Sequence, residues 1–248
     1  MSQNPTVMTT GSVITKDKHQ IFYDHYSAGN QQVIVIAHGF FNSKNSVLLK
    51  QLASGLLVEF DIILLDFRGH GKSEGLFYWT SKEYLDLEAV LEFAAIKYKK
   101  IGLIGFSLGA ATSIITCAKN NIVNSLIAVS APTEFEKIDY KFWELDVEND
   151  IVYNLGQGAI GKGVRPGPFW LKKDKPINLV EKLSLPVCFI HGDKDWVIYP
   201  SHSEALFENV KTKKQIKIIK DGPHAEYLMR NHSQQMLEII KNWFKETL

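Results

Sequence analysis

The clearest indication of the fold in this chain is the segment IGLIGFSLGAATSII at residues 101–115. It begins with an apolar run of strand length and ends with residues that favour a helix. The motif GFSLG at residues 105–109, with the pattern G-x-S-x-G, joins the two parts. When such a motif connects a strand to a helix, its glycines leave room for a sharp, strained turn that exposes the serine hydroxyl at the positive end of the helix. We therefore predict a strand over 101–106, a helix over 108–119 and an exposed Ser107 hydroxyl between them.

The same alternation of strands and helices continues on both sides of this stretch. Continuous apolar runs indicate strands that are buried on both faces, as in a parallel sheet covered by helices. The runs predict strands over residues 20–26, 32–37, 61–66, 125–129, 186–191 and 215–219. Helical spacing of apolar residues predicts helices over residues 45–57, 201–208 and a C-terminal segment that contains Met236, Ile240, Trp243 and Phe244. We expect one α/β domain over residues 1–248, with a mostly parallel, doubly wound central sheet.

A further helix is expected to end near Tyr98. Thr80 and Glu83 have the spacing of a capping box, in which a hydroxyl and a carboxylate each satisfy a free backbone N–H at the start of a helix. Apolar residues at helical spacing follow, among them Leu87 and Leu91. The sequence therefore predicts that the helix starts with this capping box.

The alternation stops between residues 132 and 182. Open parallel sheets bind ligands at the carboxyl ends of their strands, and long irregular loops in compact domains are often functional. We therefore expect an insertion over residues 133–182 that forms a cap over this edge of the sheet. An irregular excursion with a small core of its own is the alternative.

The composition excludes several classes of protein. The 248 residues have a net charge of +1, and 45% of them are hydrophobic. A nucleic-acid binder would carry a basic excess, and a disordered chain would be less apolar. No apolar run approaches the roughly 20 residues of a membrane helix, and the polar residues 1–10 lack the apolar core of a secretory signal. We expect a cytoplasmic protein that binds no nucleic acid, does not span a membrane and keeps Cys117 and Cys188 reduced in its core.

A serine hydroxyl is a poor nucleophile unless a base takes its proton and a third group orients that base. Candidates for both follow Ser107 along the chain. Asp193 and Asp195 come directly after the predicted strand that ends at His191, and His224 comes after the next predicted strand. Because the carboxyl ends of parallel strands meet at one edge of a sheet, we expect these side chains to lie near Ser107.

With these residues the chain resembles the serine hydrolases of the α/β-hydrolase family over nearly its whole length. The matching motifs are GFSLG at 105–109, HGF at 38–40, DFRGHGKS at 66–73 and HGDKD at 191–195. The chain is most similar to bacterial carboxylesterases, of the feruloyl (cinnamoyl) esterase type or the monoacylglycerol lipase type.

The resemblance implies roles for five residues. Ser107 is the nucleophile, His224 the base and Asp195, whose spacing fits the family better than that of Asp193, the acid. The backbone N–H groups of Phe40 and Leu108 form the oxyanion hole. The family forms an acyl-enzyme that water then hydrolyses, and it needs no metal or organic cofactor.

Three tryptophans are expected to bind the substrate. Trp143 and Trp170 lie in the predicted insertion, and Trp196 lies beside Asp195. Large aromatic side chains often pack in cores, which is the alternative for each of them. Their positions predict a small to medium-sized apolar or aromatic ester as the small-molecule substrate.

Other functions remain open at this point. Aminopeptidases, thioesterases and carbon–carbon bond hydrolases of the family share the Ser-His-Asp triad, whereas a serine at residue 107 argues against the relatives that use a carboxylate nucleophile. A non-catalytic protein that binds ligands with a hydrolase fold is the alternative from another class, and the three intact residues argue against it. The sequence leaves the oligomeric state open.

Overall fold

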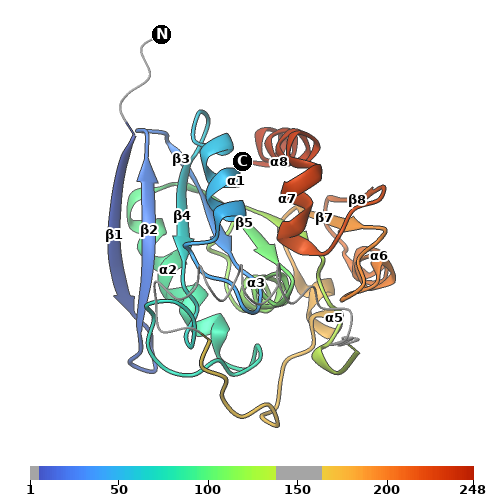
Figure 1. Cartoon of the computed structure of the whole chain (residues 1–248), viewed down its shortest axis with the longest axis horizontal. Coiled ribbons are helices and arrows are strands. Elements are labelled where there is room, and N and C mark those ends of the chain that lie inside the picture. The colour runs from blue at the N-terminus through green and yellow to red at the C-terminus, as the bar shows by residue number, and fades with distance from the viewer. Residues whose placement is uncertain (1–5, 138–163) are drawn as a thin grey trace.

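The computed structural model, which describes residues 6–137 and 164–248, contains an eight-stranded sheet (Figure 1). The strands lie in the order β1-β2-β4-β3-β5-β6-β7-β8. β1 and β2 pair antiparallel, as do β2 and β4, and every other pair of neighbours is parallel. The strands are β1 (Val7–Ile14), β2 (Gln20–Ser27), β3 (Gln32–Ala37), β4 (Asp61–Leu65), β5 (Lys100–Phe106), β6 (Ser125–Val129), β7 (Val187–Gly192) and β8 (Lys214–Ile219).

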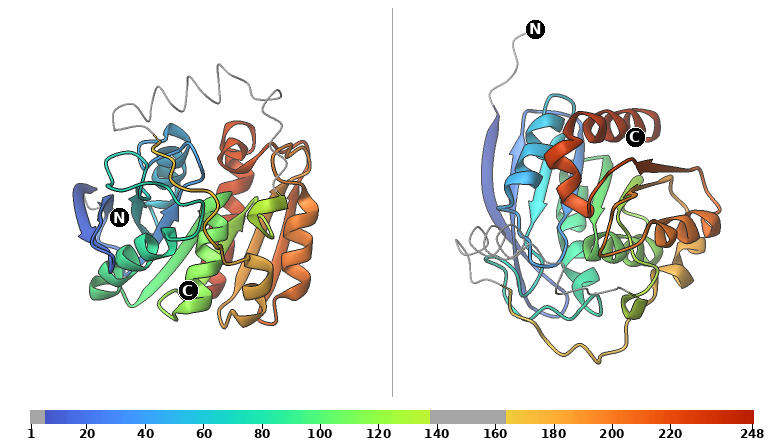
Figure 2. Two further views of the ribbon diagram at one scale, coloured as in Figure 1. Left: turned by 90° about the horizontal axis from the view of Figure 1, so that it is seen from below. Right: turned by 45° about the vertical axis from the view of Figure 1, so that its right-hand side comes forward.

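Helices cover both faces of this sheet, as the views in Figure 2 show. One core layer joins α2 (Glu83–Lys97), α3 (Leu108–Lys119) and α6 (Pro200–Asn209) to one face. The other joins α1 (Val47–Leu56) and α8 (Ser233–Thr247) to the opposite face. Shorter helices are η1 (Phe135–Lys137), α5 (Pro176–Leu179), η4 (Val180–Lys182), η5 (Ala225–Tyr227) and α7 (Leu228–Asn231).

The doubly wound α/β prediction is confirmed. The apolar runs became strands because both of their faces are covered: residues 33–37 and 62–65 are all fully buried. β3, β6 and α3 have the predicted bounds, and the other predicted strands and helices differ from the observed ones by one or two residues at their ends. Cys117 and Cys188 are buried, unpaired thiols, and burial raises the pKa of each to about 12.

The strand β1 was not predicted. It pairs antiparallel with β2 along the edge of the sheet, from Val7 opposite Ser27 to Ile14 opposite Gln20. Most of its side chains are exposed, including those of Val7, Met8 and Ile14. An edge strand with both faces largely in solvent carries no apolar run, so the pattern that identified the buried strands does not find it.

The predicted capping box is wrong. The helix α2 begins at Glu83, and Thr80 lies in the preceding turn with a φ of 78°. The carboxylate of Glu83 accepts hydrogen bonds from the backbone N–H groups of Tyr78 (2.6 Å) and Lys82 (3.3 Å) instead. Burial raises the pKa of Glu83 to about 7.

The structure describes both ends of the predicted insertion. The backbone N–H of Ile177, in α5, donates to the carbonyl oxygen of Thr133 (3.0 Å), and Val180 is fully buried in the core. Residues 176–182 therefore pack against α3 and α6, in the core layer on that face of the sheet. Trp143 lies outside the described residues.

Candidate active site

Ser107 lies in a strained turn between β5 and α3. Its φ of 53° and ψ of −119° fall where a residue with a side chain is rarely found. Such strain costs about 1–3 kcal/mol, and it is concentrated at functional sites. Two backbone hydrogen bonds fix the turn. The N–H of Ser107 donates to the carbonyl oxygen of Val129 (2.9 Å), and the carbonyl oxygen of Ser107 accepts from the N–H of Ala110 (2.9 Å).

The two motif glycines are required by close packing. A Cβ atom on Gly105 would lie 2.5 Å from the Oγ of Ser113, and one on Gly109 would lie 2.4 Å from the carbonyl oxygens of Ala37 and His38. These distances are too short for real side chains. The glycines therefore let α3 pack directly against the ends of β5 and β3, which aims the start of the helix at Ser107.

The structure brings His224 and Asp195 to Ser107, as the sequence predicts. The Nε2 of His224 lies 3.0 Å from the Oγ of Ser107. Its Nδ1 lies 2.8 Å and 2.9 Å from the two carboxylate oxygens of Asp195. Because a carboxylate only accepts, Nδ1 carries the proton, and Nε2 is left to accept the proton of the serine hydroxyl.

Asp195 is held as an anion. Burial by itself raises its pKa, but the neighbouring ring of His224 and a hydrogen bond from His191 outweigh it and hold the pKa of Asp195 well below its usual range. One of its oxygens also accepts from the backbone N–H groups of Val197 (3.0 Å) and Ile198 (2.9 Å). The site therefore has a fixed negative charge behind the imidazole of His224.

The two predicted oxyanion donors belong to segments that lie next to Ser107. Leu108 is the first residue of α3, so its N–H belongs to the turn that has no acceptor within the helix. The loop after β3 passes so close that a Cβ on Gly39 would lie 3.2 Å from the Cβ of Ser107. This approach places the Phe40 segment next to the serine. Because of this approach Ser107 is buried, with 7% of its surface exposed, whereas the sequence predicted an exposed hydroxyl at this position.

A buried histidine holds the Phe40 loop in place. The Nδ1–H of His38 donates to the carbonyl oxygen of Gly39 (2.7 Å), and its Nε2 accepts from the backbone N–H of Phe67 (3.1 Å). Complete burial lowers the pKa of His38 to about 4, so the ring is neutral at physiological pH. His38 therefore ties the loop after β3 to the loop after β4.

An apolar cluster lies beside these groups. Its buried members are Phe77, Leu108 and Ile198, of which Leu108 follows Ser107 and Ile198 contacts Asp195 through its backbone. Four partly buried side chains pack on them: Phe40, Trp79, Phe135 and Val197. Trp79 is central to this cluster, because its ring lies 4.8 Å from that of Phe40 and 5.4 Å from that of Phe135.

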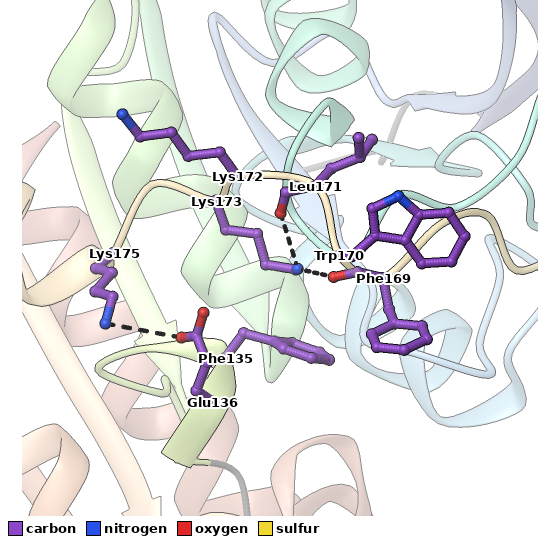
Figure 3. A pocket seen from close by; sticks show the side chains of 8 residues that line it. All are labelled: Phe135, Glu136, Phe169, Trp170, Leu171, Lys172, Lys173 and Lys175. Carbon is purple, nitrogen blue, oxygen red and sulfur yellow. Dashed lines mark hydrogen bonds and ion pairs between the residues drawn. The ribbon is translucent and has the colours of Figure 1, made fainter.

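The structure places the two described tryptophan candidates outside this cluster. Trp196 is half-buried in the turn after β7. Trp170 is 73% exposed and packs edge-on against Phe169, with ring centroids 5.4 Å apart. Trp170 and Phe169, but not Trp196, line a hollow of about 430 Å³ that also includes Phe135 and several lysines (Figure 3). Phe135 is thus shared between the hollow and the apolar cluster.

Sequence reasoning missed three residues of this region. Trp79 was not among the predicted substrate-binding residues, because it lies outside the insertion and only its ring contacts bring it to Phe40. Asn42 and Glu226 are buried polar residues that hydrogen-bond each other across 184 positions of sequence. Each lies two residues from a predicted site residue, and this nearness in the sequence was the one indication that could have identified them.

Residues 6–137 and 164–248 bring together no group of three or more His, Cys, Asp or Glu side chains that could hold a metal ion. No helix formed by them combines the length and the apolar character needed to cross a bilayer.

Comparison with known families and curated proteins gives matches over most of the chain. A family described as the alpha/beta hydrolase fold matches residues 32–159. Protein YqkD of Bacillus subtilis is 28% identical over 218 residues, which cover 80% of this chain and 66% of YqkD, so the chain spans slightly less than two thirds of that relative. Serine hydrolase BPHL of Mus musculus is 21% identical over 248 residues, which cover 90% of this chain and 82% of BPHL.

Solved structures share the fold. An esterase of Pyrococcus furiosus, Pf2001, superposes with a TM-score of 0.79 at 20% identity, covering 98% of this chain and 93% of the esterase. The esterase RhEst1 from Rhodococcus sp. ECU1013 superposes with a TM-score of 0.77 at 18% identity, covering 97% of this chain and 100% of RhEst1. At these identities, the likeness concerns the fold alone.

Proposed function

The chain belongs to the alpha/beta hydrolase fold family, and we propose that it is a serine hydrolase that cleaves carboxylic esters through an acyl-enzyme. The observation that carries this proposal is the continuous hydrogen-bonded series from Ser107 through His224 to Asp195, with its serine in a strained turn. A serine hydrolase among the relatives and two esterases among the structures that share the fold support the same class of reaction.

The first half-reaction forms the acyl-enzyme. The Oγ of Ser107 attacks the ester carbonyl carbon while the Nε2 of His224 takes the hydroxyl proton. Negative charge then develops on the carbonyl oxygen, and the backbone N–H groups of Leu108 and Phe40 donate to it. The bond to the leaving alcohol breaks as His224 returns the proton to the alcohol oxygen. Asp195 keeps the ring in the required tautomer and stabilises its cation.

The second half-reaction uses the same groups on water. His224 takes a proton from a water molecule, whose oxygen attacks the acyl carbon, and the oxyanion donors bind the new negative charge. When the intermediate collapses, the proton moves from His224 to the Oγ of Ser107. The carboxylic acid leaves, and the enzyme is restored without any cofactor.

The apolar cluster beside the serine supports an apolar or aromatic ester as the substrate. Phe40 and Leu108 carry the two oxyanion donors on their backbones, and their side chains belong to the cluster that contains Trp79. A group attached to the bound carbonyl therefore meets aromatic and aliphatic side chains rather than charges. Mostly apolar walls with a few placed polar groups are typical of small-molecule sites.

The insertion at residues 133–182 completes this site as a cap in our proposal. Phe135, near its start, packs on Trp79 in the cluster, and Trp170, near its end, lines the hollow that shares Phe135. Both ends of the insertion thus lead to the same apolar region. Trp143, Trp170 and Trp196 remain proposed contacts for the more distant parts of a substrate.

Hydrolysis of p-nitrophenyl acetate and butyrate tests the proposed function. Wild type should release nitrophenol with saturable kinetics, and the Ser107→Ala variant should be at the level of the uncatalysed reaction. Extending the assay to feruloyl esters, thioesters and aminoacyl amides identifies the bond that is cleaved. Equal, slow release by wild type and Ser107→Ala for every substrate would contradict the proposal.

A further inference from the structure

Asn42 and Glu226 form a buried polar contact that the reaction described above does not use. The side-chain Nδ2–H of Asn42 donates to a carboxylate oxygen of Glu226. Each residue is only 6% exposed. The side-chain oxygen of Asn42 also accepts from the backbone N–H of Ser43 (2.9 Å), which fixes the orientation of the amide. A buried pair of this kind is costly to leave incomplete, so both partners are strongly constrained.

The contact joins two loops that carry different parts of the proposed site. Asn42 lies in the loop after β3, two residues beyond Phe40, whose N–H is a proposed oxyanion donor. Glu226 lies in η5, two residues beyond His224. The second carboxylate oxygen of Glu226 lies 3.8 Å from the point that a Cβ atom on Gly39 would occupy. The carboxylate therefore lies against the backbone of the loop after β3.

The turn after His224 needs such an anchor. Ala225 has a φ of 46°, which is uncommon for a residue with a side chain. Its backbone N–H donates to the Oγ of Ser130 (3.0 Å), which anchors the turn to the loop after β6. The contact between Glu226 and Asn42 anchors it on the other side, to the loop after β3. His224 is thus carried by a strained turn that is held from two directions.

We propose that Glu226 and Asn42 are positioning residues that hold the base His224 and the oxyanion donor Phe40 in register with each other across Ser107. This inference rests on the proposed function, because it assigns the pair a role in that reaction. Neither side chain is required to touch the substrate. Their hydrogen bond sets the distance between the group that moves the proton and the group that stabilises the charge.

The expected effect is on turnover. A displacement of about 1 Å at a catalytic group can lower the rate about 100-fold, so loss of the bond in Asn42→Ala or Glu226→Ala should lower kcat about 10- to 100-fold. KM should change much less, because the apolar cluster that contacts the substrate is left intact. Asn42→Ala combined with Glu226→Ala should be little worse than either single variant, since both remove the same bond.

A polarity swap separates positioning from general loss of structure. Glu226→Gln keeps an oxygen that accepts from Asn42 and should retain most of the wild-type kcat. Asn42→Asp places two carboxyl groups in contact and should lose kcat at least as severely as Asn42→Ala. Combining Asn42→Asp with Glu226→Gln restores an amide-to-carboxylate bond with the donor on the other side, and it should recover most of the loss.

Asn30→Ala provides the matched control. The side-chain amide of Asn30 also donates to a carboxylate, that of Asp61 (3.2 Å), but it lies just before β3, at the amino end of that strand. This variant should keep the wild-type kcat while losing a similar amount of stability against urea. The result that overturns the inference is a wild-type kcat for Asn42→Ala and Glu226→Ala, a swap variant no better than Asn42→Asp, or an equal loss of kcat in Asn30→Ala.

The reaction of wild type with a fluorophosphonate keeps the two proposals distinguishable. If wild type is labelled at Ser107 and hydrolyses esters, but the Asn42 and Glu226 variants do so equally fast, the positioning role alone is wrong. If wild type neither becomes labelled nor hydrolyses any ester, the proposed function is wrong, and the positioning role falls with it.

Discussion

Two clusters of serine, histidine and aspartate side chains lie at opposite ends of the parallel strands. At the carboxyl ends, the ring of His224 bridges Asp195 and Ser107. At the amino ends, Asp61 starts β4 and accepts a hydrogen bond from the hydroxyl of Ser27 (2.7 Å). The residue types are the same, but their connections differ.

In the cluster at the amino ends, the histidine is not placed between the carboxylate and the serine. The hydroxyl of Tyr98 donates to Asp61 (2.6 Å), so it accepts from the Nε2–H of His25 (2.7 Å). Backbone N–H groups of Ala28 and Asn30 also donate to the carboxylate. Burial raises the pKa of Asp61, but these hydrogen bonds outweigh it and lower the pKa, which makes the carboxylate a weak base. This cluster can hold strands together, but it cannot activate Ser27.

Backbone strain separates the two ends as well. Phe41, Ser107, Ser130, Asp221 and Ala225, which follow strands at the carboxyl edge, all have positive φ values. Ser27 instead ends the regular strand β2 and pairs with Val7 of β1. The order in which the side chains are connected and the local backbone strain, rather than the residue types, therefore distinguish a reactive serine from a structural one.

Removing the histidine from each cluster should give the largest contrast. His224→Ala removes the base and should lower kcat about 10⁶-fold, as loss of a base does in related chemistry. His25→Ala removes one buried hydrogen bond and should cost about 1–2 kcal/mol of unfolding free energy with kcat unchanged. Ester hydrolysis and urea unfolding measure the two quantities. Comparable losses of kcat in both variants would break the distinction between the clusters.

The aspartates should differ almost as strongly. Asp195→Asn no longer stabilises the imidazolium and favours the wrong tautomer, so kcat should fall about 10⁴-fold at neutral pH. Asp61→Asn should leave kcat unchanged and destabilise the fold by about 2 kcal/mol, because the amide nitrogen faces hydrogen-bond donors. Circular dichroism establishes that both variants are folded before kcat is compared. A folded Asp195→Asn variant with wild-type kcat would contradict the assigned role.

The apolar cluster is a further difference between the two ends, and Trp79 tests it. Trp79→Ala should change the ratio of kcat/KM between aromatic and acetyl esters about 10-fold, which is typical for a lost apolar contact in a pocket. Trp170→Ala and Trp143→Ala, in the proposed cap, should change the preference for longer acyl chains. An unchanged substrate profile in all three variants would mean that these tryptophans serve only in packing.

The dependence of stability on pH should give the smallest effect. The pKa of Asp61 is lowered by folding, so the stabilisation from its ionised form is complete above about pH 4, the usual pKa of aspartate, and is lost as the pH falls through the folded-state pKa. The difference in unfolding free energy between wild type and Asp61→Asn should therefore be largest at neutral pH and shrink as the pH falls below about 4. Urea midpoints at several pH values measure it. A difference that is constant with pH would show that the charge of Asp61 contributes nothing.

The pH dependence of activity should follow a different group. The pKa of Asp195 is held well below its usual range, so this carboxylate stays ionised across the acid side of the activity profile. The acid limb of kcat/KM should therefore report protonation of His224. Asp61→Asn should leave this limb in place even where it changes stability.

The sequence predicted the parts of this architecture that depend on local pattern. β3 and β6 are apolar on both faces, so the first and last residues of these strands could be predicted from their apolar runs. Ser107, Asp195 and His224 each follow a predicted strand, and a parallel sheet brings such positions to one edge. The predicted capping box before α2 was wrong because Glu83 accepts hydrogen bonds from Tyr78 and Lys82 instead, and these contacts depend on how that turn folds.

Other features depend on contacts that no local pattern records. β1 is an exposed edge strand, which has no apolar periodicity of the buried kind. Trp79 reaches Phe40 only because the loops after β3 and β4 converge. The bond between Asn42 and Glu226 joins loops from opposite ends of the chain. Such pairings arise only when the folded topology brings these loops together.

Labelling with a fluorophosphonate, followed by peptide mapping, shows directly which serine of the protein is activated. The reagent phosphonylates a serine only where a base and an oxyanion site are assembled around it. We expect one label per chain on Ser107, none on Ser27 and none in the Ser107→Ala variant. A folded wild-type protein that takes up no label, or that carries the label on Ser27, would contradict the proposed role of Ser107.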